Sequence, residues 1–385
     1  MLTEWNAYKR VPLPVASAKG SDLWLQDGRR VLDLYGGHCV NTLGAGDPSL
    51  GEVIARQWQR WSFATNLLDH APRRDFQEAF AANLPAGDWV VFCSNSGAEA
   101  NENALKTALA ATGRRLVACF TGAFHGRTAA AAAVSDTKKA AFPQAPFEVL
   151  RLPWGDLAEA QARLDGRVGA VILEPIQSLA GVTIPPPGFL AGLRQRCDEL
   201  GALLVFDEVQ TGNGRLGTPW ASQHYGVIPD LFTTAKGAAG GLPIGLTVAR
   251  AAVAARCPDG LLGSTFGGGP TVLAAAAHVA SRIASPGFLA NVKGASASLR
   301  AAILGAGTPT KRNPVASIRG EGLLLGLVLR EGESAAAVRD HWLSRGVLVG
   351  TSDDPRVLRL SPALTLEPAS AARLASAIAE SEAAA

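Results

Sequence analysis

One lysine stands in a setting that suits covalent chemistry. Lys236 follows the apolar run Leu231–Thr234 and comes just before a glycine-rich stretch that includes Gly240 and Gly241. A lysine buried at such a point loses part of its proton affinity by desolvation, and Schiff-base chemistry needs the neutral amine that results. A surface lysine is the alternative interpretation, but it needs no such setting. The sequence therefore favours Lys236 as a nucleophile.

Carboxylates follow two other apolar runs. Glu174 comes directly after Val168–Leu173, and Asp207 comes directly after Ala202–Phe206. A glutamine stands three residues beyond each acid. A carboxylate at the end of a buried strand is costly unless it is paired or hydrogen-bonded. These residues therefore indicate a shared polar site, with a pair of solvated strand ends as the equally simple alternative.

The segment Ser94–Asn101 combines small residues with the start of a helical pattern. Ser96, Gly97 and Ala98 leave backbone N–H groups exposed there, and the helix dipole favours an anion beside them. Ser96 and Glu99 also have the spacing of a capping box, so an ordinary N-cap is a competing and compatible interpretation.

Phe124, His125 and Arg127 follow another apolar run, Leu116–Phe120. The aromatic ring could stack on a flat ligand and the arginine could hold an anion, whereas a lone histidine is more often structural.

A different motif, Gly212–Gly217, matches G-x-G-x-x-G, but it does not open a helix next to its strand. We therefore reject a dinucleotide-binding interpretation.

Composition narrows the class of protein. The 385 residues are 48% apolar and 18% charged, with a net charge of +3 and no basic run, so we expect no nucleic-acid partner. The five cysteines lie far apart without metal-ligand spacing, which favours a reducing cytoplasm and no metal. We expect no secretory signal in the polar residues 1–10, and no membrane span because charges, glycines and prolines interrupt the alanine-rich stretches.

The chemistry-bearing residues sit on an alternation of strands and helices. The alternation predicts a mostly parallel sheet covered by helices on both faces, with ligands at the carboxyl ends of its strands. We expect strands at Trp89–Cys93, Leu116–Phe120, Val168–Leu173, Ala202–Phe206, Leu231–Thr234 and Ile244–Val248, and helices at Ala98–Ala111 and Gly188–Leu200.

The two ends of the chain have a different character. The first residues suggest strands at Leu23–Asp27 and Arg30–Leu34. The C-terminal part reads as a smaller α+β domain with elements at Phe288–Leu304, Val315–Arg319, Leu323–Leu329, Ser334–Ser344, Val347–Gly350, Val357–Leu360 and Pro368–Glu382. We predict an N-terminal segment, 1–45, that joins the small domain, a large domain, 46–285, and a small C-terminal domain, 286–385.

Taken in order, these blocks resemble the class III aminotransferases, which use pyridoxal 5′-phosphate (PLP) and have fold type I, an α/β fold. Any one block is weak, but the ordered set is specific and spans roughly residues 20–365. The blocks are Ser94–Asn101, Phe124–Thr128, Glu174–Gln177, Asp207–Gly214, Thr234–Gly237, Gly263–Gly268, Arg319–Gly326 and Val357–Pro362.

The resemblance implies roles for the cofactor-binding residues. Lys236 would bind the cofactor covalently and then act as general base, and Asp207 would pair with the protonated ring nitrogen. Gln210 would bind the ring hydroxyl oxygen and Phe124 would stack on the ring. The phosphate would be held by Ser96, Gly97, Ala98 and, from a neighbouring subunit, Thr265. The last contact implies a homodimer with the site at the subunit interface.

The resemblance also implies a substrate pair. Arg359 would clamp the α-carboxylate of the amino donor or of 2-oxoglutarate, and Arg127 would hold a second carboxylate. Glu174, His38 and Asn66 are further expected substrate contacts. The segments Leu32–Val40 and Val347–Leu360 are similar to acylornithine aminotransferases. We therefore expect transfer of the δ-amino group of an N-acylornithine, with acetyl favoured and succinyl an alternative, in arginine biosynthesis.

The chain departs from the family at two positions. Leu179 stands where the family has a glutamate that masks the carboxylate-binding arginine, and Gly269 replaces an asparagine. Leu179 disfavours the nearest alternative, an ω-transaminase for ornithine, γ-aminobutyrate or a diamine. The two arginines disfavour a lyase, decarboxylase or isomerase of the same fold. Intact Lys236, Asp207 and Gln210 disfavour a non-catalytic relative.

Overall fold

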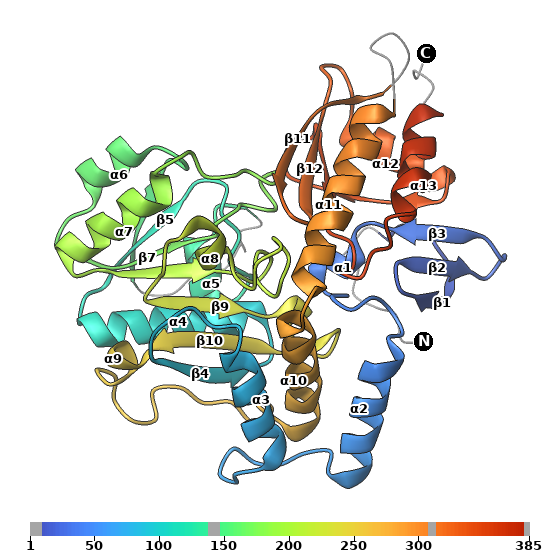
Figure 1. Ribbon diagram of the computed structural model, residues 1–385. Helices are drawn as coiled ribbons and strands as arrows, with labels where there is room; N and C mark the ends of the chain where they lie inside the picture. The colour runs from blue at the N-terminus through green and yellow to red at the C-terminus, as the bar shows by residue number, and fades with distance from the viewer. Residues whose placement is uncertain (1–9, 138–146, 307–312, 381–385) are drawn as a thin grey trace, which may run out of the picture.

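The predicted strands form one central sheet. A computed structural model describes residues 10–137, 147–306 and 313–380. Its seven-stranded sheet has the order β4-β10-β9-β8-β7-β5-β6, in which only β10 runs antiparallel to its neighbours (Figure 1). The strands are β4 Trp89–Ser94, β5 Leu116–Phe120, β6 Glu148–Leu152, β7 Val168–Leu173, β8 Leu203–Asp207, β9 Leu231–Thr234 and β10 Gly245–Arg250.

Helices cover both faces of this sheet, because its central strands are apolar on both sides. On one face pack α4 Gly97–Thr112, α5 Ala129–Val134 and α9 Ala251–Ala254. The other face is covered by α3 Ala71–Ala81, α6 Leu157–Arg163, α7 Phe189–Leu200, α8 Ala221–Tyr225 and α10 Pro270–Ala284. The mostly parallel, helix-covered sheet of the predicted fold class is thus confirmed.

The N-terminal and C-terminal segments pack on each other. Strands β1 Val15–Lys19, β2 Asp22–Leu25 and β3 Arg30–Asp33 form a sheet that β13 Val347–Leu348 completes by pairing in parallel with β3. A second sheet has the order β11-β12-β15-β14, with β11 Val315–Glu321, β12 Leu324–Leu329, β15 Val357–Leu360 and β14 Gly350–Thr351. The remaining helices are α1 Gly36–Cys39, α2 Pro48–Arg60, α11 Phe288–Gly305, α12 Ala335–Ser344, α13 Ser370–Ala379 and a 3-10 turn, η1, at Lys236–Ala239.

One apolar core joins these terminal segments. Leu32 and Leu34 are fully buried in a cluster with Val347, Leu358 and Leu360. This shared core supports the predicted assignment of residues 1–45 to the small domain, and the three-part division with its boundaries stays a prediction.

The expected elements begin and end within two residues of the observed ones, with two exceptions. Several further elements were not expected, among them β1, α2, α3 and the edge strand β6. The strand expected at Val347–Gly350 is two strands in different sheets, because β13 pairs with β3 and β14 pairs with β15. The helix expected at Pro368–Glu382 is observed at Ser370–Ala379, and residues 381 and 382 lie outside the described residues.

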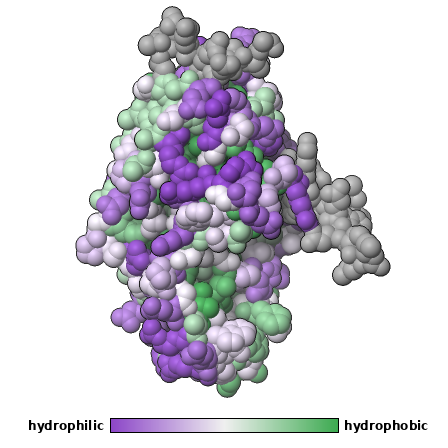
Figure 2. All heavy atoms as spheres, turned by 90° about the vertical axis from the view of Figure 1, so that its right-hand side faces the viewer, coloured by the Kyte–Doolittle hydropathy of each residue, from purple (hydrophilic) through white to green (hydrophobic). Residues whose placement is uncertain are grey.

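Figure 2 shows hydrophilic and hydrophobic side chains interspersed on the side that carries the β1–β3 strands. Ion pairs from Arg30 and Arg373 to Asp22 lie at this sheet. Within the described residues, no single helix is long and apolar enough to cross a membrane, and the one pair that would be, α10 with α11, is bent by 73°.

Candidate active site

A cavity of about 450 Å³ opens at the carboxyl ends of β5, β7, β8 and β9, where ligands bind in such sheets. Most of the predicted site residues line it: Ser96, Gly97, Ala98, Phe124, Arg127, Glu174, Asp207, Gln210 and Lys236. Arg359, His38, Asn66 and Thr265 are not part of its lining.

Lys236 is the first residue of η1 and comes two residues after the end of β9. Burial lowers the pKa of Lys236, which increases the fraction of neutral amine. The backbone of Lys236 has φ of 37°, a left-handed conformation that is strained for a residue with a side chain. Gly237 permits the turn, because a Cβ there would collide with Thr42 Oγ1. The side chain of Lys236 is half-buried, and its surroundings desolvate the amine as the sequence predicts.

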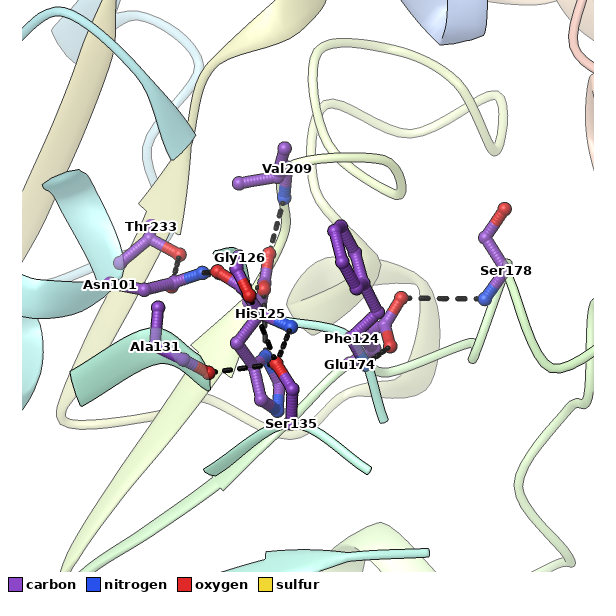
Figure 3. Close-up of polar contacts among 11 residues, drawn as sticks. Asn101, Phe124, His125, Gly126, Ala131, Ser135, Glu174, Ser178, Val209 and Thr233 are labelled. Carbon is purple, nitrogen blue, oxygen red and sulfur yellow. Dashed lines mark hydrogen bonds and ion pairs between the residues drawn. The ribbon is translucent and has the colours of Figure 1, made fainter. Parts of the chain in front are cut away.

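Three donors fix the Asp207 carboxylate. Asn101 Nδ2 and His125 Nδ1 both donate to Asp207 Oδ2 at 2.8 Å, and Val209 N donates to Oδ1 at 3.1 Å. Thr233 Oγ1 in turn donates to Asn101 Oδ1 at 2.6 Å. Figure 3 shows Asn101, His125 and Val209, the three residues that supply these donors. The carboxylate is therefore held in place while one side remains on the cavity.

Glu174 is a second buried acid in the cavity wall. Its Oε1 accepts from Phe124 N at 2.9 Å, and its Oε2 accepts from Ser178 N at 3.4 Å. Burial, followed by the nearby Asp207 charge, raises the pKa of Glu174 to about 7. Figure 3 shows the Phe124 ring standing beside this carboxyl group. The carboxyl group thus supports the backbone that carries Phe124.

The two predicted glutamines have different positions. Gln210 lines the cavity, and its Oε1 accepts from Ser178 Oγ at 3.1 Å. Gln177 lies outside the cavity lining and donates from Nε2 to Thr121 O at 2.8 Å. The predicted shared site therefore contains both acids and one of the glutamines.

Arg359 lies on β15, two hydrogen bonds beyond the cavity lining, through Ser178 and then Gln210. Its Nη1 donates to Ser178 Oγ at 3.1 Å, its Nη2 donates to Tyr35 OH at 2.6 Å, and its Nε donates to Thr351 O at 2.7 Å. The Tyr35 ring also faces the guanidinium, whose Cζ is 5.4 Å from the ring centre. The side chain is buried.

His38 is presented by a left-handed turn. Four successive residues, Gly36–Cys39, have φ between 56° and 67°, which is strained for His38 and Cys39. The His38 ring packs on Tyr35 with centroids 4.4 Å apart. Burial, together with the charges of Arg359 and Lys236, lowers the pKa of His38 to about 4. This histidine is therefore neutral at physiological pH.

The N-terminus of α4 lies at the cavity and is capped by Ser96. Ser96 Oγ accepts from Glu99 N at 3.2 Å, so the capping interpretation is confirmed. The first amides of a helix have no partner within it, and those of Gly97 and Ala98 lie at the cavity. Next to them, Asn95 Nδ2 donates to Ser264 Oγ at 3.2 Å.

Thr265 and Asn66 lie on the outer side of this region. Thr265 is exposed in the loop after Ser264, and Asn66 Nδ2 donates to Ser264 O at 2.8 Å. Arg73 Nη2 donates to Asn66 Oδ1 at 2.8 Å. Within one chain, neither residue reaches the cavity lining.

Sequence reasoning missed four residues that hold the site together: Asn101, Thr233, Tyr35 and Ser178. Asn101 lies in the first turns of α4, inside the recognised block Ser94–Asn101, and Thr233 on β9 pairs with Asp207 on β8. Their positions in or beside recognised blocks were a usable signal. Tyr35 and Ser178 come from segments far apart in the sequence, and no local pattern links either of them to Arg359.

Comparison with known proteins agrees with this arrangement. The family model for class III aminotransferases matches residues 5–381. Acetylornithine aminotransferase of Streptomyces coelicolor is 41% identical over 94% of this chain and 89% of its own length. The crystal structure of N-acetylornithine aminotransferase from Stenotrophomonas maltophilia has a TM-score of 0.83 at 32% identity and covers 97% of both chains. Ornithine aminotransferase from Toxoplasma gondii, described with PLP at its active site, has a TM-score of 0.88 at 26% identity, over 97% of this chain and 90% of its own.

The chain therefore belongs to the class III aminotransferases. It is a PLP-dependent aminotransferase, which acts on an amino acid and a keto acid. The cavity fits this cofactor: it brings together a half-buried lysine of lowered pKa, a fixed carboxylate, an aromatic ring and a helix N-terminus. These are the groups that an aldehyde, a pyridine nitrogen, a flat ring and a phosphate require.

Proposed function

We propose that this enzyme transfers the δ-amino group of an N-acylornithine, with acetyl favoured over succinyl, to 2-oxoglutarate in arginine biosynthesis. The observation that carries the proposal is the buried Arg359, held next to a cavity that contains Lys236 and Asp207. An arginine that lies apart from the reactive lysine suits a long amino acid that reacts at one end and is held at the other. The names of the relatives support the acylornithine substrate.

We propose that the residues of this cavity would hold the cofactor, with Phe124 against its ring. Asp207 would pair with the ring nitrogen, Gln210 would bind the ring oxygen, and the amides of Gly97 and Ala98, with Ser96, would hold the phosphate. When bound, PLP supplies an electron sink at the carbon that bears the transferred amino group. The donors around Asp207 support its role, because they hold the carboxylate in one orientation at the cavity.

We propose that Lys236 Nζ carries the cofactor and then moves the proton. It takes the proton from the substrate carbon next to the transferred nitrogen and returns it on the cofactor side. The lowered pKa of Lys236 supports this step, because a neutral amine is the form that accepts a proton. Phe124 and Glu174 line the same cavity as Lys236.

We propose that Arg359 binds the α-carboxylate of the amino donor or of 2-oxoglutarate, and that Arg127 binds a second carboxylate. His38 is neutral and adds no competing charge; it would contact the acyl group, and Asn66 and Glu174 would be further substrate contacts. Leu179 supports an α-carboxylate donor, because a leucine cannot pair with Arg359. A donor without that carboxylate would leave the guanidinium unpaired.

We propose that a second copy of the chain covers an exposed apolar surface near the Thr265 loop. Trp58, Leu67 and Phe266 are 64%, 91% and 68% exposed, and the rings of Phe63 and Phe266 lie 5.6 Å apart. Apolar patches of this kind mark interfaces. In the dimer, Thr265 reaches the phosphate site of the partner. Leu67→Asp is expected to lower the mass in equilibrium sedimentation, and an unchanged dimer would refute this interface.

We also propose a cytoplasmic location. The five cysteines are all free thiols, which supports a reducing compartment. Fractionation of cells followed by immunodetection would test it, and recovery in an exported fraction would refute it.

The decisive experiment follows the visible absorption of the purified enzyme. Addition of N-acetylornithine without a keto acid is expected to remove the band of the bound cofactor, and 2-oxoglutarate is expected to restore it. The same titration with N-succinylornithine, ornithine and γ-aminobutyrate ranks the donors. A band that N-acetylornithine leaves unchanged and γ-aminobutyrate removes would replace this proposal with an ω-transaminase for donors that lack the α-carboxylate.

A further inference from the structure

The buried Arg359 guanidinium has only neutral partners among the described residues. Its three hydrogen bonds go to the Thr351 carbonyl, the Ser178 hydroxyl and the Tyr35 hydroxyl, and it forms no ion pair within the described ranges. A guanidinium has five N–H donors, so these bonds leave one on each terminal nitrogen. A buried cation without a counter-ion is costly, and an incoming carboxylate relieves that cost.

The Ser178 hydroxyl connects this cation to the cofactor side of the cavity. Arginine can only donate, so Ser178 Oγ accepts from Arg359 Nη1, and its single proton goes to Gln210 Oε1. The reverse orientation of the Gln210 amide would leave the hydroxyl proton without an acceptor. Because Oε1 is held by Ser178, the Nε2 of Gln210 remains as the donor for the cavity that this residue lines.

The backbone presents this hydroxyl from a fixed turn. Ser178 N donates to Glu174 Oε2, and Ser178 O accepts from Val182 N at 3.0 Å. Figure 3 shows the Ser178 side chain pointing away from the Glu174 carboxyl group. Ser178 is completely buried, so water does not compete for its hydroxyl.

The same turn is attached to the C-terminal sheet. Asp353 N donates to Leu179 O at 2.9 Å, and Arg319 Nε donates to Gly181 O at 2.5 Å. The hydroxyl, the guanidinium and the Gln210 amide therefore belong to one rigid arrangement across the two sheets.

We propose that Ser178 is a positioning residue that orients the Arg359 guanidinium and the Gln210 amide together, so that one hydroxyl couples carboxylate recognition to the cofactor's ring oxygen. This inference rests on the proposed function. Its consequence is a carboxylate site that is preformed: no acidic side chain has to leave before the substrate binds. The site selects donors that carry an α-carboxylate.

The test compares Ser178→Ala with Tyr35→Phe in the holoenzyme. Both variants remove one neutral partner of Arg359, but only Ser178→Ala removes the bond to Gln210. The first measurement is the affinity for glutarate, a dicarboxylate without amine or keto group, by calorimetry. The second is the pH midpoint of the visible absorption of the bound cofactor, which reports on the hydrogen bonds around its ring.

Each variant is expected to weaken glutarate binding about tenfold, the effect of one hydrogen bond to a charged group. Only Ser178→Ala is expected to move the pH midpoint, by about half a unit or more. Ser296→Ala is the matched control, because Ser296 is a buried serine that donates to Gly322 O outside the site. It should leave both measurements at the wild-type value.

Unchanged glutarate affinity and pH midpoint in folded Ser178→Ala would overturn the inference. A weaker affinity with an unmoved midpoint would overturn the coupling to Gln210. If Ser178→Ala does not fold, Ser178→Cys takes its place, since a thiol has nearly the same volume but donates and accepts weakly. Failure of the proposed function is distinguishable, because the wild-type enzyme itself would then not react with N-acetylornithine.

Discussion

The two ends of the substrate path are built in opposite ways. At the cofactor end, Asp207 is an anion surrounded by donors from α4, from the segment after β5 and from its own turn. At the carboxylate end, Arg359 is a cation surrounded by neutral oxygens from three distant segments. On the proposed function, the cofactor would complete the first end, whereas each substrate would complete the second. A resident group therefore has a dedicated counter-ion, and a group that must exchange has none.

The largest effect is expected at the cofactor end. Lys236→Ala should lower kcat by about 10⁴-fold, because both the covalent attachment and the proton transfer are lost. Steady-state assays with N-acetylornithine and 2-oxoglutarate measure the change, and the visible band of the covalently bound cofactor should disappear with it. Lys106→Ala, at an exposed position on α4, is the control. Substantial activity in Lys236→Ala would remove the lysine from the mechanism.

Arg359→Ala tests the carboxylate end. Loss of a partner in a buried charge pair costs about 2–5 kcal/mol, so kcat/KM with 2-oxoglutarate should fall about thirty- to several-thousand-fold. The variant should retain PLP, since Arg359 lies outside the cavity lining. Exposed Arg356, just before the same strand, provides the control Arg356→Ala. Loss of PLP together with activity would show that Arg359 also holds the cofactor.

Asn101→Ala measures how much one donor contributes at Asp207. Two donors remain, so PLP affinity is expected to fall only about tenfold. Equilibrium dialysis of the cofactor gives the change. Asn83→Ala removes another buried asparagine, one that donates to Ala79 O and Ala280 O away from the cavity, and should leave PLP affinity unchanged. Equal losses of PLP affinity in both variants would mean that reduced folding stability causes the effect, and not the lost bond to Asp207.

The smallest effect concerns the residue next to Asp207. Glu208 is buried under α8, where Ala221 N and Ser222 N donate to it, and burial raises its pKa from 4.5 to about 7. Between these two pH values the folded protein keeps a proton that the unfolded chain has lost. The free energy of unfolding should therefore fall as pH rises through this window, by up to about 1.4 kcal/mol per pH unit.

Glu208→Gln should remove that pH dependence, because an amide does not titrate. Urea unfolding at a series of pH values measures it. The variant is also expected to lose about 1–3 kcal/mol at every pH, since one buried backbone N–H then faces the amide's own N–H groups. An unchanged slope would assign the pH dependence to another group, such as Glu174.

The cofactor end could be predicted from the sequence because each of its parts follows a strand. Parallel strands bring their carboxyl ends to one edge, so the positions of Asp207, Lys236 and Glu174 after apolar runs already placed them together. Arg359 was found only through family resemblance. Its neighbours Tyr35 and Ser178 were not found, because contacts between segments far apart in the chain leave no local periodicity. The split of residues 347–350 between two sheets was missed for the same reason.

The pairing of β13 with β3 has a consequence for the order in which the strands can pair during synthesis. Leu32 pairs with Val347, about 300 residues later in the chain. During synthesis from the N-terminus, β3 therefore waits with an unpaired edge until nearly the whole polypeptide has emerged from the ribosome, although its hairpin partner β2 is available from the start. The first strands to be made are thus among the last to be completed, and a ribosome that stalls before residue 347 leaves that edge open to other chains.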